Sequence, residues 1–221
     1  LDGFNGNISA MQGDFRQQSL NGNINYRMEK LNLFTSMDFR TGDRVGDGLR
    51  QFQYDYSYKT DSLFQNTSRT STPNNTGLRI GGDYYPSTTT TIGYTLDISE
   101  HKESEKSEIE YVINTINPDM IGEMNMEESD NGYHIDHVVS YENKFDSKEQ
   151  LLKGYASLAH EIDDVFETGV MENQYGLDRT SMGTKALEDN TNITIALDYE
   201  DKYGDKLDVE MGTKFTIRNF G

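Results

Sequence analysis

The chain has 221 residues, of which 33% are hydrophobic, and its aromatic residues are 14 Tyr and 10 Phe with no Trp. A sequence so poor in aliphatic residues and so rich in Tyr builds little closed core and much half-exposed sheet. The net charge of −18 repels phosphate backbones, so nucleic acid is not expected as a partner. The absence of cysteine excludes a disulfide scaffold, a thiolate nucleophile and a Cys-ligated metal.

Membrane and export signals are also readable from composition. No stretch approaches the roughly 18 consecutive apolar residues of a membrane helix, so a helical span is excluded. A membrane β-barrel is still allowed, because its strands alternate lipid-facing and lumen-facing residues and look only half hydrophobic. The residues after Leu1 lack the basic start and apolar run of a signal peptide, so a mature chain or a fragment is expected.

The clearest pattern is the alternation of apolar or small residues with polar residues over residues 20–28. This period of two predicts a two-faced strand. The alternation resumes over residues 31–39 after two charged residues, so the two runs predict a tight hairpin. The Gly- and Asp-rich stretch from Thr41 to Gly48 is then predicted to be a long loop.

A third run places aromatic residues on one face of an expected strand. They are Phe52, Tyr54, Tyr56 and Tyr58. In a soluble sandwich such a stripe lies in the core, whereas in a membrane barrel it is the lipid face at the aromatic girdle. The Ser, Thr and Asn composition from Ser62 to Thr76, with Pro73, predicts a loop.

Further alternating runs predict the remaining strands. They are residues 78–84 and 90–98, joined by a turn at Pro86 and Ser87, residues 133–141, and residues 193–199 and 207–215, joined by a turn from Tyr203 to Lys206. Short turns thus alternate with long polar loops, which is how a membrane barrel distributes its periplasmic and extracellular connections.

Two segments admit a helix as well as a strand. In residues 107–116 the apolar residues share one helical face, and Ser107 with Glu110 fits a capping box, so both alternatives stay open. Residues 147–167 also have helical spacing, but residues 152–158 alternate as a strand does. We favour the strand for the second segment because residues 132–145 need a hairpin partner.

Five short strand motifs follow one another along the chain, and they are GNINYR at residues 22–27, KLNLF at 30–34, GGDYY at 81–85, ALDY at 196–199 and KLDVEMGTK at 206–214. The order of these motifs resembles the outer-membrane barrel domain of TonB-dependent receptor-like proteins of the Bacteroidetes. These motifs span nearly the whole chain. Each is a strand pattern with a few fixed polar residues.

The resemblance implies a barrel of about twenty strands in the outer membrane of a Gram-negative bacterium. Such a barrel closes around a plug domain and imports a nutrient with energy from a TonB-type complex. By strand count the chain resembles about half of such a barrel, without a plug or a coupling segment, and Phe220 is followed by Gly221 instead of closing the last strand. Outer-membrane lipid, the plug, the coupling complex and an unidentified nutrient are the implied partners.

No catalytic, cofactor-binding or metal-binding residue is predicted, and the chain is not expected to be an enzyme. It has no nucleophile elbow, Walker loop or Rossmann glycine pattern, and no family site residue can be transferred because those positions lie on variable loops and on the plug. The pair Gly81 and Gly82 predicts a kink or a place where a bulky neighbour packs.

Two kinds of candidate metal ligand are interpreted as ordinary surface groups. The histidines are His101, His134, His137 and His160. His134 and His137 are three apart and would face opposite sides of a strand, so they cannot share a metal. The acidic clusters are Asp163, Asp164 and Glu167, and Glu127, Glu128 and Asp130. Their spacing is not that of a calcium-binding loop, so solvated loops at a barrel mouth are the preferred interpretation.

The predicted fold is therefore one all-β domain over residues 1–221. It is an antiparallel up-and-down meander of about ten strands that is part of a β-barrel or curls into one, with short helices near 107–116 and 147–167 as the open alternative. The predicted function is that of an outer-membrane barrel segment of TonB-dependent receptor type in nutrient uptake. If isolated, the segment is expected to self-associate through its edge strands.

The alternative function is a soluble or surface-exposed antiparallel sheet domain that binds a glycan or a protein. A membrane barrel turns its aromatic residues outward as a belt, whereas a sandwich hides them between two sheets. The residues that distinguish the two are Tyr26, Phe39, Phe52, Tyr54, Tyr56 and Tyr94.

Overall fold

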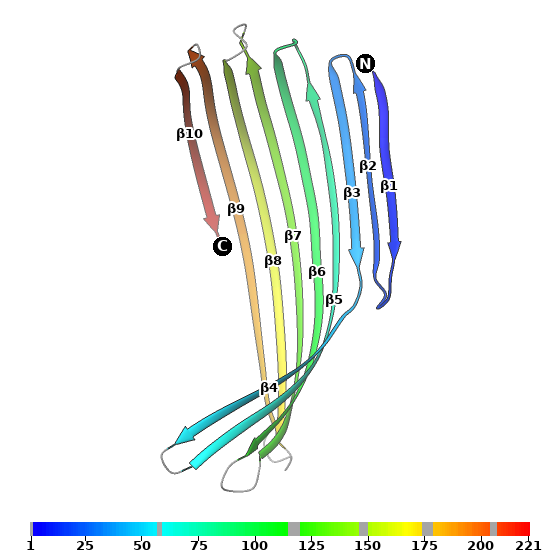
Figure 1. The fold of residues 1–221 in the computed structure, drawn as a ribbon, viewed down its shortest axis with the longest axis vertical. Helices are drawn as coiled ribbons and strands as arrows, with labels where there is room; N and C mark the ends of the chain where they lie inside the picture. Colours follow the sequence, from blue (N-terminus) through cyan, green and yellow to red (C-terminus); the bar gives the residue numbers. More distant parts are fainter. Residues whose placement is uncertain (1, 57–58, 115–119, 146–149, 174–178, 204–206) are drawn as a thin grey trace.

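The computed structural model describes residues 2–56, 59–114, 120–145, 150–173, 179–203 and 207–221. It contains ten strands in chain order, and the sheet that they form is open (Figure 1). The strands are β1 (Gly3–Gln12), β2 (Gln18–Met28), β3 (Leu31–Thr41), β4 (Arg44–Tyr56), β5 (Lys59–Tyr84), β6 (Thr90–Asn114), β7 (Met120–Lys144), β8 (Leu151–Asn173), β9 (Arg179–Tyr203) and β10 (Leu207–Phe220). The predicted antiparallel meander is confirmed.

Each strand pairs with its neighbours in the chain, except where β3 and β4 share one partner. β3 pairs with residues 74–84 of β5, and β4 pairs with residues 59–71 of the same strand. β3 and β4 therefore lie end to end along β5, and the sheet has the order β1-β2-β3-β5-β6-β7-β8-β9-β10. β1 and β10 are the two ends of this order, and β4, which pairs only with β5, is a further edge strand (Figure 1).

The alternating runs have the hairpin registers that the sequence predicts. Met28 pairs with Leu31, and Tyr84 pairs with Ile92, so each hairpin keeps the apolar residues of both strands on one face. Because side chains alternate between faces along a strand, that register leaves the polar residues together on the opposite face. The turn expected from Tyr203 to Lys206 includes residues 204–206, which lie outside the described residues.

Both predicted long loops are wrong. Thr41 ends β3 and β4 begins at Arg44, while the stretch from Ser62 to Thr76 lies inside the 26-residue strand β5. A segment rich in Ser, Thr and Asn is predicted to be a loop only if every strand is expected to carry a hydrophobic face. Here both faces of the segment are polar, and the β-branched threonines favour extended backbone.

Pro73 is tolerated in β5 because of the break between β3 and β4. The pairing of β5 with β3 ends at Asn74, and its pairing with β4 begins at Ser71, so Pro73 lies beside the gap at Gly42 and Asp43. A residue without an N–H group suits a position where the strand lacks a partner on one side.

The helical alternative is wrong at both segments as far as they are described. Residues 107–114 belong to β6 and residues 151–167 belong to β8, and none of the described residues is helical. Residues 115–116 and 147–149 lie outside the described residues. Apolar residues at spacings of three and four arise here because both faces of these strands carry some apolar side chains, which imitates a helical stripe.

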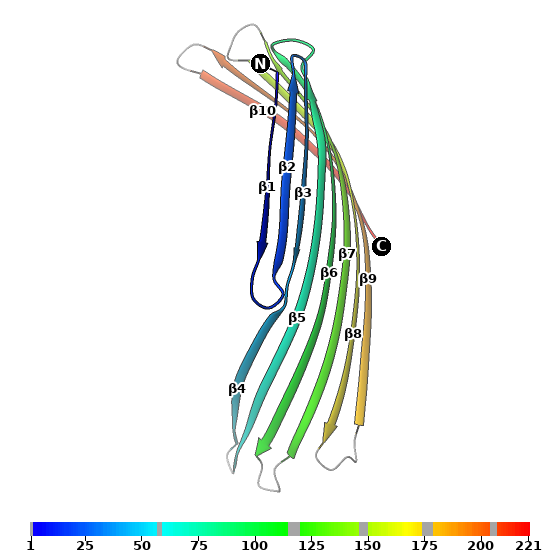
Figure 2. The ribbon, with the colours of Figure 1, turned by 90° about the vertical axis from the view of Figure 1, so that its right-hand side faces the viewer.

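The sheet is a single layer. Among the described residues, Ala196 is the only buried hydrophobic one, at 7% exposure, and no large side chain is fully buried. The strands β5–β9 run for 23 to 26 residues and bow along their length (Figure 2). Nothing within the described chain covers either face of the sheet.

Close packing within the layer occurs where a large side chain lies over a glycine. A Cβ placed on Gly81 would overlap the Phe34 ring and would lie 2.8 Å from the carbonyl oxygen of Tyr94. The expectation that a bulky neighbour packs at this glycine pair is confirmed. A glycine is thus required at position 81 because neighbouring atoms leave no room for a side chain, and not because of its backbone conformation.

We expect Gly81→Ala to destabilise the chain by about 1–3 kcal/mol, because the new methyl group overpacks against Phe34 and a backbone carbonyl. Unfolding by urea in detergent micelles, followed by tyrosine fluorescence, measures this. Gly46→Ala is the control, since a Cβ there meets nothing within 4 Å. Equal unfolding midpoints for the two variants would show that the Phe34 contact does not constrain the sheet.

Candidate functional site: an apolar band and an opposed polar face

Apolar side chains form a continuous band across one face of the sheet, at the end that carries the β2–β3 and β5–β6 turns. The pairing register places them side by side from one edge to the other. This apolar band consists of Phe4 and Ile8, Leu20, Ile24 and Tyr26, Leu33, Met37 and Phe39, Leu78, Ile80 and Tyr84, Ile92, Tyr94, Leu96 and Ile98, Ile135, Val139 and Tyr141, Leu152 and Leu158, Ile193, Ile195, Leu197 and Tyr199, and Met211, Phe215 and Ile217. Most of these side chains are exposed, with Ile195 at 54% and Val139 at 49%.

The height of the apolar band matches the apolar layer of a bilayer. In β7 the band extends from Ile135 to Tyr141, and in β10 it extends from Met211 to Ile217. At about 3.3 Å per residue these stretches span about 20–23 Å along the strand. A membrane barrel carries an apolar band about 25 Å tall.

Tyrosines mark the turn-side border of the apolar band, and carboxylates mark the other border. Tyr84 and Tyr141 are close to the turns, whereas Glu100 and Asp189 follow the last apolar row. Tyr rings prefer the interface between apolar and aqueous surroundings. The band thus has two chemically defined limits.

Three polar side chains inside the apolar band, those of Thr35, Tyr94 and His137, have hydrogen-bond partners. The Thr35 hydroxyl lies 3.0 Å from the carbonyl oxygen of Arg79 and donates to it, and the Tyr94 hydroxyl is 2.9 Å from Nδ1 of His137. A hydroxyl or imidazole without a partner would be costly in hydrocarbon. These two contacts make Thr35 and His137 compatible with an apolar environment.

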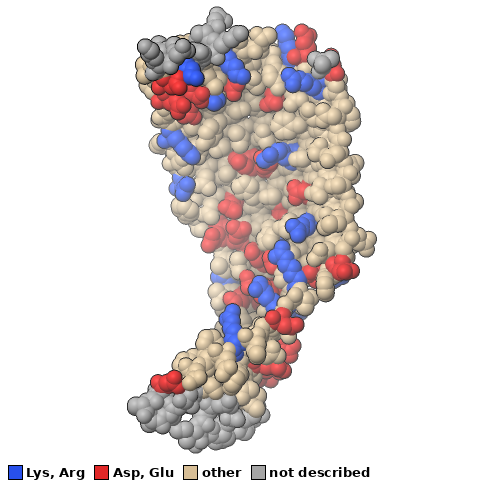
Figure 3. All heavy atoms as spheres, viewed as in Figure 1, with Lys and Arg blue, Asp and Glu red and all other residues tan. Residues whose placement is uncertain are grey.

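The opposite face of the same strands is polar. Arg79 forms an ion pair with Asp97 at 2.5 Å, and Lys153 forms one with Glu200 at 2.8 Å. Acidic and basic side chains are spread along the strands on the face turned to the viewer in Figure 3. One sheet therefore presents an apolar surface on one side and a hydrated surface on the other.

The polar face lies on the inner side of the bowed sheet. Five of its glycines are buried because neighbouring side chains lie over them, whereas most of the apolar band stays exposed. The buried glycines of this face are Gly81, Gly93, Gly122, Gly132 and Gly169. The polar face is accordingly the concave one.

Carboxylates gather on the concave face beyond the height of the apolar band. Glu105, Glu128 and Glu167 lie in one row across β6, β7 and β8. Partial burial raises the pKa of Glu128, and the charges of Glu105, Glu167 and Asp130 raise it further. The predicted solvated loop at Glu127, Glu128 and Asp130 is wrong, because these residues belong to strand β7.

The second acidic cluster and the histidines also lie on strands. Asp163 and Glu167 share the concave face of β8, and Asp164 lies on its other face beside Lys185 at 3.3 Å. His134 and His137 lie on opposite faces of β7. Among the described residues, no group of three or more His, Asp or Glu side chains has an arrangement that could hold a metal ion.

The remaining histidines have polar partners. Nε2 of His101 lies 3.8 Å from carboxylate oxygens of both Glu103 and Asp130, and Nδ1 of His160 lies 3.1 Å from the Thr191 hydroxyl. His101 is on the concave face and His160 is on the face of the apolar band, near its border. These contacts are those of surface histidines in a polar network.

The expected lipid-facing aromatic stripe is wrong for Phe52 and Tyr54. The register of β4 with β5 pairs Phe52 with Leu63, which places both aromatic residues on the concave face. The side chain of Tyr56, and Tyr58 as a whole, lie outside the described residues. Tyr26, Phe39 and Tyr94 do lie in the apolar band. β4 continues the register of β3 along β5, so the alternation from β3 carries through the break and places the even-numbered Phe52 and Tyr54 on the face opposite Phe39.

Phe52 and Tyr54 lie in the region of the concave face that also carries a second group of apolar residues, far from the turns of the apolar band. The group includes Ile109, Met124, Met126, Met171 and Met182. The sequence offered no signal for it, because methionines spaced along three different strands come together only through the register.

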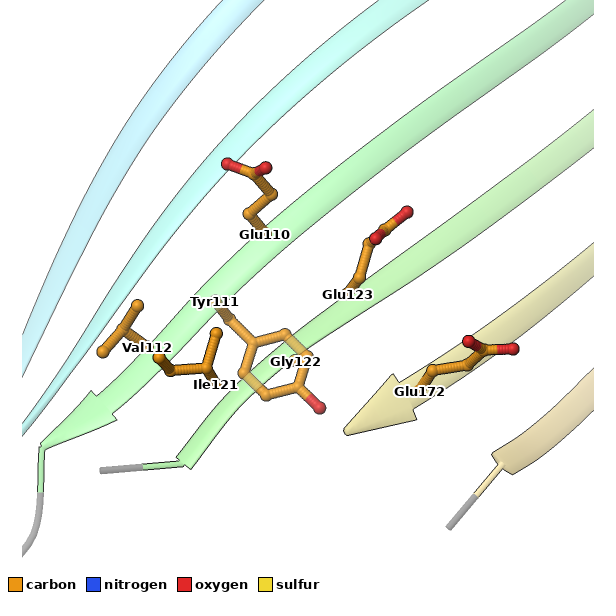
Figure 4. Close-up of a pocket in the computed structure, with 7 residues that line it drawn as sticks. All are labelled: Glu110, Tyr111, Val112, Ile121, Gly122, Glu123 and Glu172. Atoms are coloured by element: carbon orange, nitrogen blue, oxygen red, sulfur yellow. The ribbon is translucent and has the colours of Figure 1, made fainter. Parts of the chain in front are cut away.

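A shallow depression lies at the same end of the sheet. It has a volume of about 390 Å³ and lies around Tyr111, whose ring covers Gly122 (Figure 4). Glu110, Glu123 and Glu172 line it on neighbouring strands, and Glu172 is 3.1 Å from Arg179. The depression is open and mainly acidic at its rim.

An arginine links the β1–β2 loop to the break between β3 and β4. Two nitrogens of Arg16 donate to the carboxylate of Asp43, each at 2.6 Å, and the Thr72 hydroxyl donates to it at 3.0 Å. The hydrogen bonds from Arg16 lower the pKa of Asp43 most, against an opposing effect of burial, and the bond from Thr72 lowers it further. The backbone amide of Asp43 also donates to the carbonyl of Phe15.

We expect this contact to make stability fall at acid pH. Because the pKa of Asp43 is lower in the folded chain, its contribution is complete above the ordinary carboxyl pKa of about 4 and is lost as pH falls through the lowered value. Between pH 6 and pH 3 the thermal midpoint should therefore drop less in Asp43→Asn than in the unmodified chain. Asp2→Asn is the control. A drop in Asp43→Asn as large as in the unmodified chain would contradict the expectation.

No helix of the described residues is long and apolar enough to cross a membrane. No family model and no curated protein matches the sequence.

Solved structures give similarities of fold. The RagAB peptide transporter matches with a TM-score of 0.44 and 6% identity, over 91% of this chain and 32% of that one. BauA, the ferric preacinetobactin receptor of Acinetobacter baumannii, matches with a TM-score of 0.42 and 9% identity, over 99% and 41%. A major outer membrane protein of Thermus thermophilus matches with a TM-score of 0.28 and 14% identity, over 82% and 83%. The chain spans about a third of the length of the RagAB chain.

Proposed function

We propose that this chain forms part of the wall of an outer-membrane β-barrel that transports a solute. The observation that carries the proposal is the apolar band, which is continuous over all columns of the sheet and is confined to one face. Hydrocarbon would cover this band, while the concave polar face would line an aqueous lumen. The continuous backbone pairing between neighbouring strands supports the same proposal, because a lipid-exposed backbone must satisfy its polar groups within the sheet.

The finer assignment is to a TonB-dependent receptor-type protein of the Bacteroidetes that takes up a nutrient. It rests on the strand motifs at residues 22–27, 30–34, 81–85, 196–199 and 206–214. In the described chain these motifs occupy strands of the apolar band and the turns between them. On this proposal a plug domain, a TonB-type complex and outer-membrane lipid are the partners, and the chain is not an enzyme.

The alternative of a soluble binding domain requires a second layer over the apolar face. A sandwich buries one face of each sheet against the other, with side chains interdigitating. In the described residues there is one sheet, and Ile80, Val139 and Ile195 remain about half exposed. The exposure of the apolar band favours the membrane barrel.

The absence of tryptophan makes the orientation directly testable. Val138 and Val139 are neighbours in β7, on the polar face and in the apolar band respectively. We expect the fluorescence of Val139→Trp to be strongly quenched in vesicles of bromine-labelled phospholipid, and that of Val138→Trp to be quenched little. The same substitution at adjacent positions is the matched control.

Equal quenching at the two positions would contradict the proposed orientation, and no quenching at either would contradict membrane insertion. Quenching of Val138→Trp alone would place the polar face in lipid. The Trp emission maximum is a second readout, since an indole in hydrocarbon emits at shorter wavelength than one facing water.

A charge scan gives an energetic test of the same surface. Val139→Arg should reduce stability in lipid vesicles by about 2–4 kcal/mol, because it places a cation in the hydrocarbon near its midplane. Val138→Arg should change stability much less, because its side chain remains hydrated. Urea titration of the folded fraction in vesicles measures both. A similar cost at the two positions would contradict a lipid-facing Val139.

A further inference from the structure

Four methionines surround one glycine on the concave face, beyond the height of the apolar band. In the pairing register Gly169 of β8 lies between Met126 of β7 and Met182 of β9, and these three strands are neighbours (Figure 1). Met171 follows Gly169 by two residues on the same face of β8, and its direct partner on β7 is Met124. Met124, Met126, Met171 and Met182 together are the methionine cluster.

Side chains of the methionine cluster converge over Gly169. Apart from the chain neighbours, the three heavy atoms nearest to a Cβ placed on this glycine all belong to methionines. They are Cγ of Met182 at 3.2 Å, Cε of Met124 at 3.5 Å and Sδ of Met182 at 3.7 Å. Because Cε is bonded directly to Sδ in methionine, thioethers from the strands on both sides of β8 meet over one backbone position.

The methionine cluster is open to solvent. Met182 is 47% exposed, and the other three methionines are half-buried. The floor of the cluster is closed, since Gly169 is buried beneath these side chains. An ion can therefore reach the cluster from the concave side without any movement of the backbone.

Packing alone does not explain sulfur at all four positions. The chain has 9 methionines, and four of them form this cluster from three strands. The apolar band is made mainly of Ile, Leu, Val and Tyr, and its methionines Met37 and Met211 lie far apart on β3 and β10. Leu would fill a similar volume. What the four positions share is a thioether sulfur on a hydrated face.

Thioether sulfur has a defined preference among metal ions. It is a soft, neutral ligand that selects Cu⁺, whereas carboxylate and carbonyl oxygens suit Mg²⁺ and Ca²⁺. Methionine has three rotatable bonds, so sulfurs on neighbouring strands can turn toward one ion. The chain has no cysteine, so no thiolate competes with the thioethers for a soft ion.

A row of carboxylates borders the methionine cluster and attracts cations to it. Glu128 follows Met126 by two residues on the same face of β7, and Glu167 precedes Gly169 by two on β8. Burial raises the pKa of Glu128, and the charges of Glu105 and Glu167 raise it further. A cation beside this row would offset the mutual repulsion of the carboxylates. The carboxylates thus favour any cation, and the sulfurs favour a soft one.

We propose that the methionine cluster binds one soft monovalent metal ion, Cu⁺ or Ag⁺, over Gly169. The thioether sulfurs are its ligands, and the row of Glu105, Glu128 and Glu167 raises the local concentration of the ion. The site goes beyond the proposed function, because binding on the concave face depends neither on lipid at the apolar band nor on the transported solute.

Silver is the probe for this site, because Ag⁺ is soft and monovalent like Cu⁺ and is not oxidised in air. The full chain in detergent micelles, with its 9 methionines labelled at the ¹³C methyl group, is titrated with silver nitrate in a chloride-free buffer. We expect the methyl signals of the methionine cluster to shift and to reach a plateau at one ion per chain. Shifts of the same size at Met37 and Met211 would overturn the proposal, and so would an absence of shifts in the cluster.

Paired substitutions separate sulfur from apolar surface. Met124→Leu combined with Met182→Leu removes two thioethers at little cost in packing. The matched control is Met37→Leu combined with Met211→Leu, which removes two thioethers from the apolar band. In equilibrium dialysis, the cluster variant should bind Ag⁺ roughly tenfold more weakly or worse, and the control should keep the Kd of the unmodified chain. Equal Kd values for the two variants would overturn the proposal.

Competition with a hard cation tests whether oxygen or sulfur holds the ion. A roughly hundredfold excess of Ca²⁺ should leave the methyl shifts in place, because carboxylates and not thioethers bind Ca²⁺. Loss of the shifts on addition of Ca²⁺ would overturn the proposal. The titration contains no vesicles, whereas quenching of Val139→Trp is measured in vesicles, so failure of the metal site and failure of the proposed function are read separately.

Discussion

The constraint on which the structure depends is that each strand satisfies its backbone polar groups through its neighbours within one sheet, which no second layer of the described chain covers. Within the described residues, each of the four ladders between β5 and β9 contains more than twenty residue pairs. The sheet is therefore stabilised by backbone hydrogen bonds between neighbouring strands and by cross-strand side-chain contacts, and not by a core. The faces are left free to meet two different surroundings.

Strand alternation made much of this architecture predictable. The hairpins around residues 20–39 and 78–98 follow from period-two alternation with short turns, because a one-residue slip would move the whole apolar set to the other face. The apolar band follows from the same pattern. Its continuity across β7 to β10 required the register, which depends on connections that the sequence leaves undefined.

The parts that could not be predicted share one physical cause. Beyond the apolar band both faces of a strand meet water, so hydrophobic alternation disappears and Ser62 to Thr76 has the composition of a loop. In the same region Phe52 and Tyr54 lie on the concave face, because the alternation of β3 continues in register into β4 and places even-numbered residues opposite Phe39. Aromatic content alone therefore does not identify a lipid-facing strand.

The length of β5–β9 has a mechanical consequence. At about 3.3 Å per residue a 25-residue strand reaches about 80 Å, so more than half of it stands clear of the apolar band. In hydrocarbon a separated pair of backbone groups costs several kcal/mol, whereas in water the exchange with solvent reduces the net cost to about 1 kcal/mol. Thermal unfolding will thus begin at the strand ends that lie farthest from the turns. It will proceed along the strands toward the turns and halt at the apolar band.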